Sequence, residues 1–354
     1  MNIVLDNIIF SLQKRGGISV VWSEFLKRII LQKDFSVSFI EYNNAQSNFF
    51  RKELSLDVKQ KISTLLFFKR YINPSFHMES PYIFHSSYYR VCCDPRAKNV
   101  TTVHDFTYEY FFKRIAKSIH SWQKEQAIIR SQKVICISEN TKQDLLRFLP
   151  QVSSDKICVI YNGVNKEFHP IPRGVEYDMQ LPFDRHNYLL FVGARGGYKN
   201  FEIAVDAARL VKLPLIIAGG GILTSAEIEK LNKIVGHSNY CYLGFVDNEQ
   251  LNVLYNNAFC LLYPSSYEGF GIPVIEAQKA GCPVIACYKS SIPEIIGNTK
   301  IRLEKINANI IAETIQSLIS STREYEIKQG LINAERFSWD ITFQKTIQLY
   351  RSLM

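Results

Sequence analysis

The chain lacks the features that mark secreted, membrane-spanning and zinc-stabilised proteins. No stretch approaches the roughly 20 apolar residues that cross a bilayer, and the start, MNIVLDNIIFSLQKRGG, has no basic n-region of a signal peptide. None of the eight cysteines belongs to a Cys-x-x-Cys pair, which argues against a zinc site and a disulfide framework. The sequence therefore predicts a cytoplasmic protein without a bound metal.

Other absences narrow the classes of function. There are no sequence repeats and no low-complexity tracts. The first strand–helix loop contains only Gly16 and Gly17 and no GxGxxG fingerprint, which disfavours an NAD-dependent dehydrogenase. No recognised nucleic-acid motif is present, and the aromatic residues lie in apolar runs, so a nucleic-acid partner is not expected.

The composition is that of a globular protein with an uneven charge distribution. The 354 residues are enough for two domains, and 47% are hydrophobic while 21% are charged. Residues 1–168 contain 24 Lys or Arg against 15 Asp or Glu, whereas residues 169–354 contain 18 of each. The whole net charge of +9 thus lies on the first half. We expect the two halves to face different partners.

Apolar strands alternate with helical patterns in both halves of the chain. Between 165 and 187 the periodicity fades into a segment that contains Pro170, Pro172 and Pro182, the best candidate for an interdomain linker. This pattern predicts an α/β protein with two Rossmann-like, doubly wound parallel-sheet domains that face a central cleft. The expected domains are 1–168 and 169–338, and a last helix at 339–354 is expected to pack back on the first domain.

The predicted elements are listed by residue number. Strands are expected at 2–6, 37–42, 82–85, 99–104, 133–138 and 157–160 in the first half, and at 188–192, 215–218, 241–243, 258–263 and 284–287 in the second. Helices are expected at 19–30, 49–72, 115–131, 139–148, 200–210, 249–258, 273–280, 308–320, 325–337 and 339–353, with a short one at Pro293-Glu294.

The stretch SSYEGFGIPVIEAQKAG, residues 265–281, has the pattern of an anion site. A buried strand precedes it, Gly269 and Gly271 permit close backbone approach, and Pro273 begins a helix that ends at Gly281. A glycine-containing loop before a helix N-terminus suits a phosphate. Glu268 in the loop and Glu276 in the expected first turn of the helix suggest a ligand that also carries hydroxyl groups.

A second loop, FVGARGGYKN, directly follows the strand at 188–192. Gly193, Gly196 and Gly197 leave its backbone adaptable, and Arg195 and Lys199 bring two cations to the start of a helix. Arginine binds phosphate oxygens in a bidentate manner and lysine adds a point charge, so the loop suits a diphosphate. The alternative is a solvated loop with surface cations.

The Glu-x7-Glu spacing in EGFGIPVIE, preceded by FVGARGGYKN, resembles the retaining nucleotide-sugar glycosyltransferases of the GT-B fold, family four. The likeness extends to ICISENTKQDLLRF at 135–148, YNGV at 161–164, SSIPEIIG at 290–297 and the C-terminal helix. It covers nearly the whole chain and is most specific between 188 and 297. Many relatives place the arginine directly after the strand's glycine, whereas here Ala194 intervenes.

The resemblance implies a role for each matching residue and implies neither an obligatory metal nor a cofactor. Glu268 would contact the donor sugar, Glu276 would bind the ribose, and Arg195 and Lys199 would neutralise the diphosphate. The main chain of Gly269, Phe270, Gly271 and Ile272 would hold sugar hydroxyls and phosphate.

The resemblance also implies roles for residues of the first domain. His104, in the His-Asp pair that ends a strand, would lie beside the donor sugar, although a lone histidine is more often structural. Gly16 and Gly17 would approach the phosphate or the acceptor, or simply form a helix-entry turn. In the second domain, Glu294 either accepts hydrogen bonds in the cleft or caps its own helix.

Two segments of the first half are strongly basic. Residues 49–72 hold six Lys or Arg against two acids, and residues 111–133 hold six against one. They are either solvated helix faces or a patch for the anionic inner-membrane surface.

We therefore expect retaining transfer of a hexose from a nucleoside diphosphate sugar to a saccharide hydroxyl. GDP-mannose is the first donor to test, with UDP- and dTDP-sugars as alternatives. The expected acceptor is a lipid-linked precursor of a bacterial O-antigen, capsule or other surface polysaccharide. The alternatives are a catalytically silent nucleotide-sugar-binding protein and a GT-B phosphorylase or epimerase.

Overall fold

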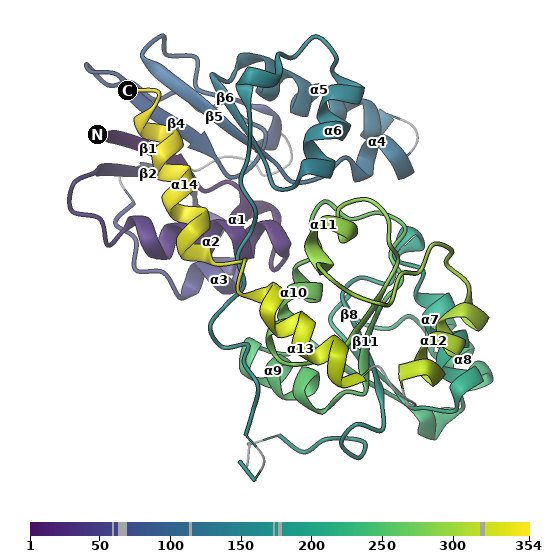
Figure 1. Ribbon diagram of the computed structural model, residues 1–354. Helices are drawn as coiled ribbons and strands as arrows, with labels where there is room; N and C mark the ends of the chain where they lie inside the picture. The colour runs from purple at the N-terminus through teal and green to yellow at the C-terminus, as the bar shows by residue number, and fades with distance from the viewer. Residues whose placement is uncertain (59, 63–68, 113–114, 173, 176–178, 319–322) are drawn as a thin grey trace. The chain divides into compact units, whose positions relative to one another are not determined.

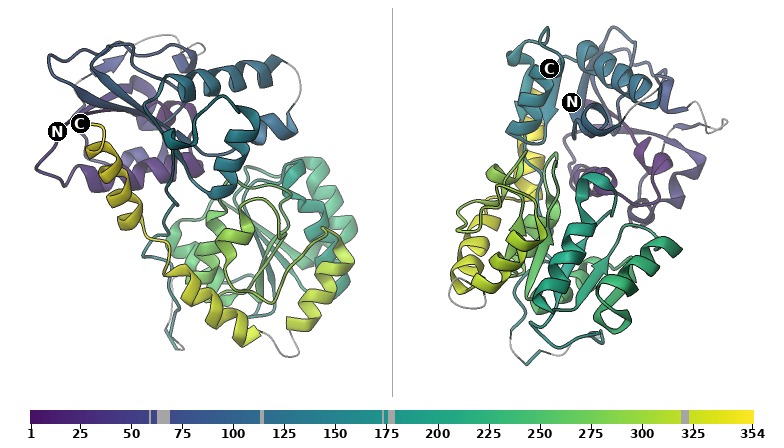
Figure 2. Two further views of the ribbon diagram at one scale, coloured as in Figure 1. Left: turned by 45° about the horizontal axis from the view of Figure 1, so that its top comes forward. Right: turned by 90° about the vertical axis from the view of Figure 1, so that its right-hand side faces the viewer.

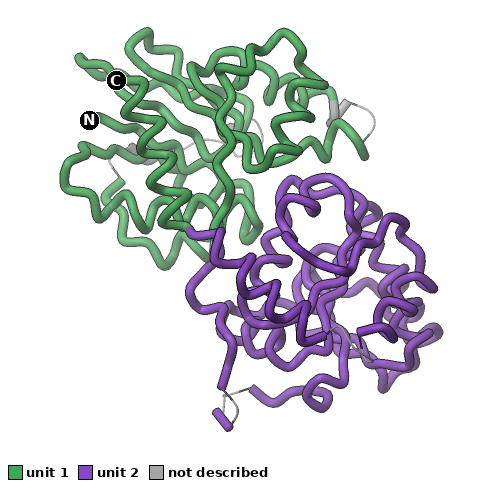
Figure 3. Tube along the Cα trace, in the orientation of Figure 1, with its two compact units in different colours: residues 1–163, 339–354 green, residues 164–338 purple. Residues whose placement is uncertain are grey.

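The structure is a computed structural model that describes residues 1–58, 60–62, 69–112, 115–172, 174–175, 179–318 and 323–354 (Figure 1). The chain forms two compact units. Unit 1 comprises residues 1–163 and 339–354, and unit 2 comprises residues 164–338 (Figure 3). The division falls between Gly163 and Val164, a few residues before the predicted one. Phe168 accounts for the difference, because it is buried against the ring of Tyr255 in unit 2.

Unit 1 contains, in the described part of the chain, a seven-stranded parallel sheet in the order β3-β2-β1-β4-β5-β6-β7. Its strands are β1 (Asn2–Asp6), β2 (Ser36–Tyr42), β3 (Gln60–Ile62), β4 (Tyr82–Ser86), β5 (Ala97–Val103), β6 (Lys133–Cys136) and β7 (Ile157–Val159). Its α-helices are α1 (Ile9–Leu12), α2 (Gly17–Ile29), α3 (Phe49–Lys52), α4 (Thr107–Phe111), α5 (Ile115–Arg130), α6 (Glu139–Phe148) and α14 (Trp339–Arg351).

Alternate residues of β1 pack into the two cores of unit 1, as the period of a strand requires. Ile3 and Leu5 face α2 and α14, whereas Val4 faces the opposite side of the sheet. Helix α14 lies beside α2 through Phe343, Ile347 and Tyr350, and both chain termini lie on this unit (Figures 1 and 2).

Unit 2 contains, among its described residues, a five-stranded parallel sheet in the order β10-β9-β8-β11-β12. Its strands are β8 (Leu189–Val192), β9 (Leu215–Ala218), β10 (Tyr240–Gly244), β11 (Cys260–Tyr263) and β12 (Val284–Ala286). Its α-helices are α7 (Phe201–Val211), α8 (Ser225–Ile234), α9 (Asn248–Asn257), α10 (Ile272–Lys279), α11 (Ile292–Ile296), α12 (Ala308–Ser317) and α13 (Arg323–Ala334).

Helices cover both faces of the unit 2 sheet (Figure 1). Helices α7, α8 and α12 lie on one face over Leu189, Ile217 and Leu262. Helices α9, α10 and α13 pack together on the other. Two doubly wound parallel sheets are therefore confirmed.

One long predicted helix is wrong, and helices α1, α4 and α8 were not predicted. The segment 49–72 forms α3, strand β3 and a 3₁₀ turn (η2, Lys69–Tyr71), while residues 59 and 63–68 lie outside the described part. Pairing of β3 with β2 supplies its main-chain hydrogen bonds, an effect that local periodicity does not show. The missed helix α8 carries a capping box, in which Thr224 and Glu227 bond each other's backbone.

The described helices include none that is long and apolar enough to cross a membrane.

Unit 1 contains a fully buried ion pair between Asp6, the last residue of β1, and Arg90, which follows β4 in the chain. The guanidinium also donates to the Tyr42 hydroxyl (2.5 Å), and the Ser86 hydroxyl donates to Asp6 Oδ2 (2.6 Å). Both side chains are 0% exposed, so removing one partner leaves an uncompensated charge in the core.

We predict that Arg90→Met destabilises unit 1 by about 3–5 kcal/mol, because the Asp6 carboxylate then stays buried without its partner. Tryptophan fluorescence during urea unfolding measures this unit selectively, since all three tryptophans, at 22, 122 and 339, belong to it. The control is Arg96→Met, which should cost less than about 1 kcal/mol, because the Arg96 side chain is 34% exposed and Asp94 keeps its bonds from His77 and the residue 96 amide. Equal losses in the two variants would contradict the account.

Candidate functional site

The candidate site of unit 2 lies where the carboxyl ends of β8, β9, β11 and β12 meet. These strands are neighbours in one parallel sheet, so the loops that follow them share one edge. The loop after β8 contains Arg195 and Lys199, and the loop after β11 contains Glu268. The order of strands thus brings together motifs that are about 70 residues apart in sequence.

The loop after β11 turns sharply into α10. Gly271 has φ of +104°, and a Cβ atom there would lie 2.9 Å from Ile292 Cδ1, so only glycine fits without displacement. Helix α10 begins at Ile272 with Pro273 in its first turn. The loop therefore leads directly to a helix N-terminus, whose first amides and dipole favour an anion.

An ion pair joins the two charged loops. Lys199 Nζ lies 2.5 Å from Glu268 Oε1, and the two side chains are only 16% and 11% exposed. The ammonium also lies 5.4 Å from the ring centre of Tyr263, the last residue of β11. Burial and the Glu268 carboxylate raise the pKa of Tyr263 well above its usual value, so its hydroxyl stays protonated and hydrogen-bonded to Glu268.

Main-chain and polar side-chain bonds reinforce this junction. The amide of Ser266 donates to the carbonyl of Tyr198 (2.7 Å), and Asn200 Nδ2 donates to Ser266 Oγ (2.7 Å). On the other side, the Glu268 amide donates to Ser290 Oγ (2.9 Å), and the Ser291 hydroxyl donates to the Glu268 carbonyl (3.0 Å). The loops after β8, β11 and β12 therefore form one connected unit.

Ser291 also binds the main chain of the predicted sugar-binding segment. Its hydroxyl donates to the Phe270 carbonyl at 2.8 Å. Ser291 immediately precedes α11, which carries Glu294 as a half-buried residue in its first turn. Gly193 follows β8 with φ of +119°, and its amide donates to the Ala218 carbonyl (2.9 Å).

Glu276 lies in the second turn of α10, not in the first turn as predicted, because the helix starts at Ile272. The buried Tyr255 hydroxyl donates to Glu276 Oε2 at 3.2 Å. Burial raises the pKa of the Glu276 carboxyl to about 7, and the hydrogen bond from Tyr255 opposes this only in part. At neutral pH the group exists in both protonation states.

Arg195 is engaged with the loop after β9. Its Nε donates to Glu227 Oε1 at 2.8 Å. Its other nitrogens donate to the carbonyls of Gly219 (3.2 Å), Gly221 (3.0 Å) and Ile222 (3.1 Å). The structure thus brings Lys199 and Glu268 together and directs Arg195 to a different group of partners.

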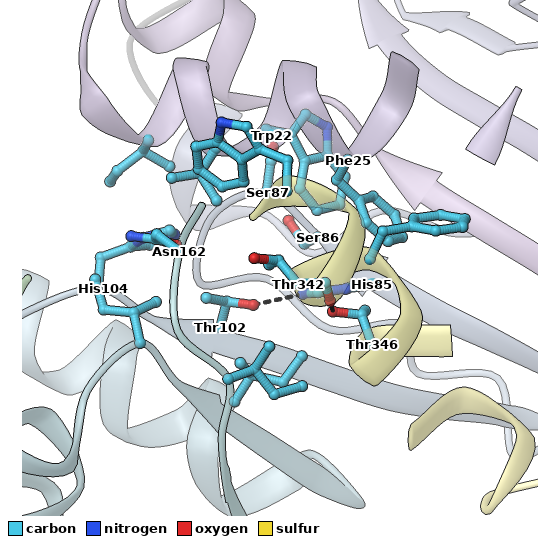
Figure 4. Close-up of a pocket in the computed structure, with 17 residues that line it drawn as sticks. Trp22, Phe25, His85, Ser86, Ser87, Thr102, His104, Asn162, Thr342 and Thr346 are labelled. Carbon is cyan, nitrogen blue, oxygen red and sulfur yellow. Dashed lines mark hydrogen bonds between the residues drawn. The ribbon is translucent and has the colours of Figure 1, made fainter. Parts of the chain in front are cut away.

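His104 of unit 1 lines a pocket bounded by α2, α14 and the carboxyl ends of β4 and β5 (Figure 4). Burial lowers the pKa of His104 to about 4, while Asp105 opposes that effect, so the ring is neutral at neutral pH. The pocket also contains His85, whose ring nitrogens bond Tyr350 and Thr102. Ile18, just after the predicted glycine pair, lines the same pocket.

Gly16 and Gly17 form the entry to α2. Gly16 is its N-cap, and its carbonyl accepts the Val20 amide at 3.1 Å. Gly17 is the first helical residue, and a Cβ atom built there would meet no neighbour within 4 Å.

Sequence reasoning missed four side chains that shape the site: Glu227, Tyr255, Tyr263 and Ser291. Only Glu227 had a readable local signal, the Thr-x-x-Glu pattern of a capping box at 224–227. The other three contact the predicted residues across the fold.

The two halves of the chain match two family models. Residues 14–168 match the model described as Glycosyltransferase Family 4, and residues 176–334 match the model described as Glycosyl transferases group 1. Together they span nearly the whole chain, with a break close to the division between the units.

Curated relatives include enzymes named for O-antigen synthesis. O-antigen chain mannosyltransferase B of Escherichia coli is 29% identical over 280 residues, which cover 72% of this chain and 70% of the relative. O-antigen chain mannosyltransferase RfbU of Salmonella typhimurium is 29% identical over 209 residues, which cover 58% of this chain and 56% of the relative.

Solved structures share the fold over the full length. Sucrose-phosphate synthase from Thermosynechococcus elongatus has a TM-score of 0.72 at 18% identity and covers 100% of this chain and 99% of its own. Anabaena HepE in complex with UDP and glucose has a TM-score of 0.71 at 15% identity and covers 99% of both chains. The chain therefore belongs to the family-four glycosyltransferases, which have the GT-B fold.

Proposed function

We propose that this protein is a retaining hexosyltransferase that uses a nucleoside diphosphate sugar and glycosylates a saccharide hydroxyl. The observation that carries the proposal is the Lys199–Glu268 pair beside the N-terminus of α10, with the Glu276 carboxyl one turn further along the same helix. This arrangement offers a cation and a helix dipole for a diphosphate, and carboxylates for hydroxyl groups.

The chemical demand of the reaction is charge stabilisation on the departing diphosphate as the glycosidic bond breaks. Lys199 donates one N–H to Glu268, and an ammonium has two further donors for phosphate oxygens. The amides from Gly269 to Ile272 and the helix dipole add a second source of positive potential. We propose that these groups stabilise the leaving group without a metal ion.

Glu268 is proposed to contact the donor sugar. The Lys199 ammonium and the Tyr263 hydroxyl fix its carboxylate, while its amide and carbonyl are held by Ser290 and Ser291. A carboxylate restrained from both sides suits the orientation of a sugar hydroxyl. In this mechanism the departing phosphate takes the acceptor's proton, so no protein general base is required.

The donor and acceptor are proposed from the relatives. Both reported relatives are named O-antigen mannosyltransferases, which makes GDP-mannose the first donor to test and UDP- and dTDP-sugars the next. A lipid-linked precursor of a surface polysaccharide is the proposed acceptor. We propose that the protein acts in the cytoplasm, on the inner-membrane surface.

Glutamate substitutions test the assigned roles. Glu276→Ala is expected to raise the donor KM about tenfold or more with little change in kcat, because ribose contacts are the same in the ground and transition states. Glu268→Ala is expected to lower kcat at least 100-fold, because it loses the orientation of the reacting sugar. Nucleotide release from GDP-mannose, or from the donor that gives the largest thermal shift, measures both parameters.

The matched control is Glu313→Ala, an exposed carboxylate on α12, which should leave both parameters unchanged. Exchange of the two effects between Glu268 and Glu276 would show that the roles are reversed. Donor binding without nucleotide release in the wild type would favour a silent binding protein.

Glu276 also predicts a pH dependence of donor binding. Its pKa is about 7 in the free protein, and ribose hydroxyls that donate to the carboxylate stabilise the charged form and lower this pKa. Donor binding should therefore release a proton near pH 7. Affinity should rise between about pH 6 and pH 8 and level off above that range.

Calorimetry of nucleotide-sugar binding in two buffers of different ionisation enthalpy counts the released protons. The control is Glu276→Gln, which cannot titrate and should show flat affinity across this range. A wild-type affinity that fell as the pH rose would contradict the assignment.

We propose that α4 and α5 carry the lipid-facing surface of unit 1. Phe111 and Phe112 are each 44% exposed, and Trp122 on α5 is 57% exposed, a combination typical of residues at a membrane interface. Lys113 and Arg114, between these aromatics in sequence, supply the positive charge. Their structure lies outside the described residues.

Two basic residues counted in the predicted patch do not belong to it. Arg51 is 4% exposed and binds Glu41, while Lys124 is 1% exposed and binds Glu109. Both residues form buried ion pairs within unit 1. The proposed contact therefore depends on aromatic side chains as much as on charge.

We predict that replacing Phe111, Phe112 and Trp122 together by serine reduces co-sedimentation with phosphatidylglycerol vesicles at least fivefold, since partitioning follows buried apolar area. Turnover of a soluble acceptor should stay unchanged. Ile332→Ser, at an apolar residue of unit 2 that is 53% exposed, is the control. Full vesicle binding by the triple variant would refute this surface.

A further inference from the structure

The guanidinium of Arg195 is almost fully enclosed, since its side chain is 5% exposed. It makes four hydrogen bonds, one to Glu227 and three to main-chain carbonyls of the loop after β9. Its Cζ atom also lies 5.5 Å from the ring centre of Tyr242. Four of the five guanidinium N–H groups are thus engaged, so bidentate contact with a diphosphate would require at least one of these bonds to be broken.

The loop that Arg195 holds has an unusual backbone. Gly219, Gly220 and Gly221 have consecutive φ values of +79°, +75° and +75°. Glycine tolerates this conformation but loses more entropy than other residues when it is fixed. External hydrogen bonds supply the restraint, because Arg195 binds the carbonyls of Gly219 and Gly221 and the Tyr242 hydroxyl donates to Gly221.

Glu227 fixes Arg195 in turn. Its Oε1 accepts from Arg195, while its Oε2 accepts from the Thr224 amide (2.8 Å) and hydroxyl (2.9 Å). The hydrogen bond from Arg195 and those from Thr224 lower the pKa of Glu227 to about 2, so it is ionised at any working pH. One carboxylate thus anchors both the arginine and the first turn of α8.

The loop ends at Ile222, which is 88% exposed. It lies at the carboxyl edge of β9, next to β8 in the sheet, where a parallel α/β fold binds its ligand. An apolar side chain held in solvent beside a ligand edge suits contact with the flat face of a nucleoside base.

We propose that Arg195 is a positioning residue which, with Glu227, shapes the Gly219–Ile222 loop to receive the nucleoside of the donor. Lys199 and the N-terminus of α10 then carry the diphosphate charge. This inference rests on the proposed nucleotide-sugar donor. It differs from the role that the family resemblance implies for Arg195, and the alanine inserted before this arginine gives a reason for the difference.

Binding of a nucleoside and its diphosphate separates the two roles. In Arg195→Lys and Glu227→Gln, affinity for GDP and for guanosine should fall by the same factor, about tenfold, and likewise for UDP and uridine if the wild type prefers them. The double variant should be no weaker than the weaker single variant, because both changes release the same loop. Donor KM should rise in proportion, with kcat changed less than threefold.

If Arg195 contacted the diphosphate instead, the variants would behave differently. Arg195→Lys would then weaken GDP but leave guanosine unchanged, and Glu227→Gln would leave GDP binding intact or tighten it by freeing the arginine. Either result overturns the inference while the proposed function stands. Failure of the wild type to bind any nucleotide would instead overturn the proposed function.

Gly220→Ala provides a second variant if the others fold poorly. A Cβ atom there would lie 2.6 Å from Arg195 Nη1, so the loop shifts while both charged side chains remain. We expect the affinities for guanosine and for GDP to fall by the same factor as each other, as in Arg195→Lys. Unchanged guanosine affinity in this variant would contradict a nucleoside-shaping loop.

Discussion

The ion pair between Lys199 and Glu268 is the contact on which the candidate site depends. It joins the loops after β8 and β11 at 2.5 Å, in surroundings where both side chains are largely buried. The attraction in such a pair offsets its desolvation cost only when further hydrogen bonds satisfy the partners. Tyr263, Ser290 and Ser291 provide such bonds to Glu268, and the glycine-rich entry to α10 places a helix dipole beside the pair.

The ion pairs of this chain have different roles. Asp6–Arg90 and Glu41–Arg51 are buried pairs that organise unit 1. Arg195–Glu227 shapes a backbone loop, and Lys199–Glu268 lies at the proposed donor site. Net charge alone therefore describes the surface poorly, since several of the arginines and lysines that contribute to +9 are enclosed.

Much of the fold was readable from the sequence, because strands such as 2–6 and 215–218 are short apolar runs bounded by polar residues, proline or glycine. The motif spacing also predicted roles for Glu268, Glu276 and Lys199, of which the structure joins Lys199 and Glu268 in one ion pair. The sequence did not predict the features that depend on tertiary contacts. These are the pairing of β3, the partners of Arg195, and the burial that raises the pKa of Glu276. Each depends on residues distant in sequence, which periodicity and capping rules do not register.

The anomeric configuration of the product tests the central claim most directly. Proton NMR of the reaction of GDP-mannose with a saccharide acceptor follows both nucleotide release and the new glycosidic bond. The account predicts one nucleotide released per sugar transferred and a product that keeps the donor's anomeric configuration. An inverted product, or stable donor binding without nucleotide release, would contradict it.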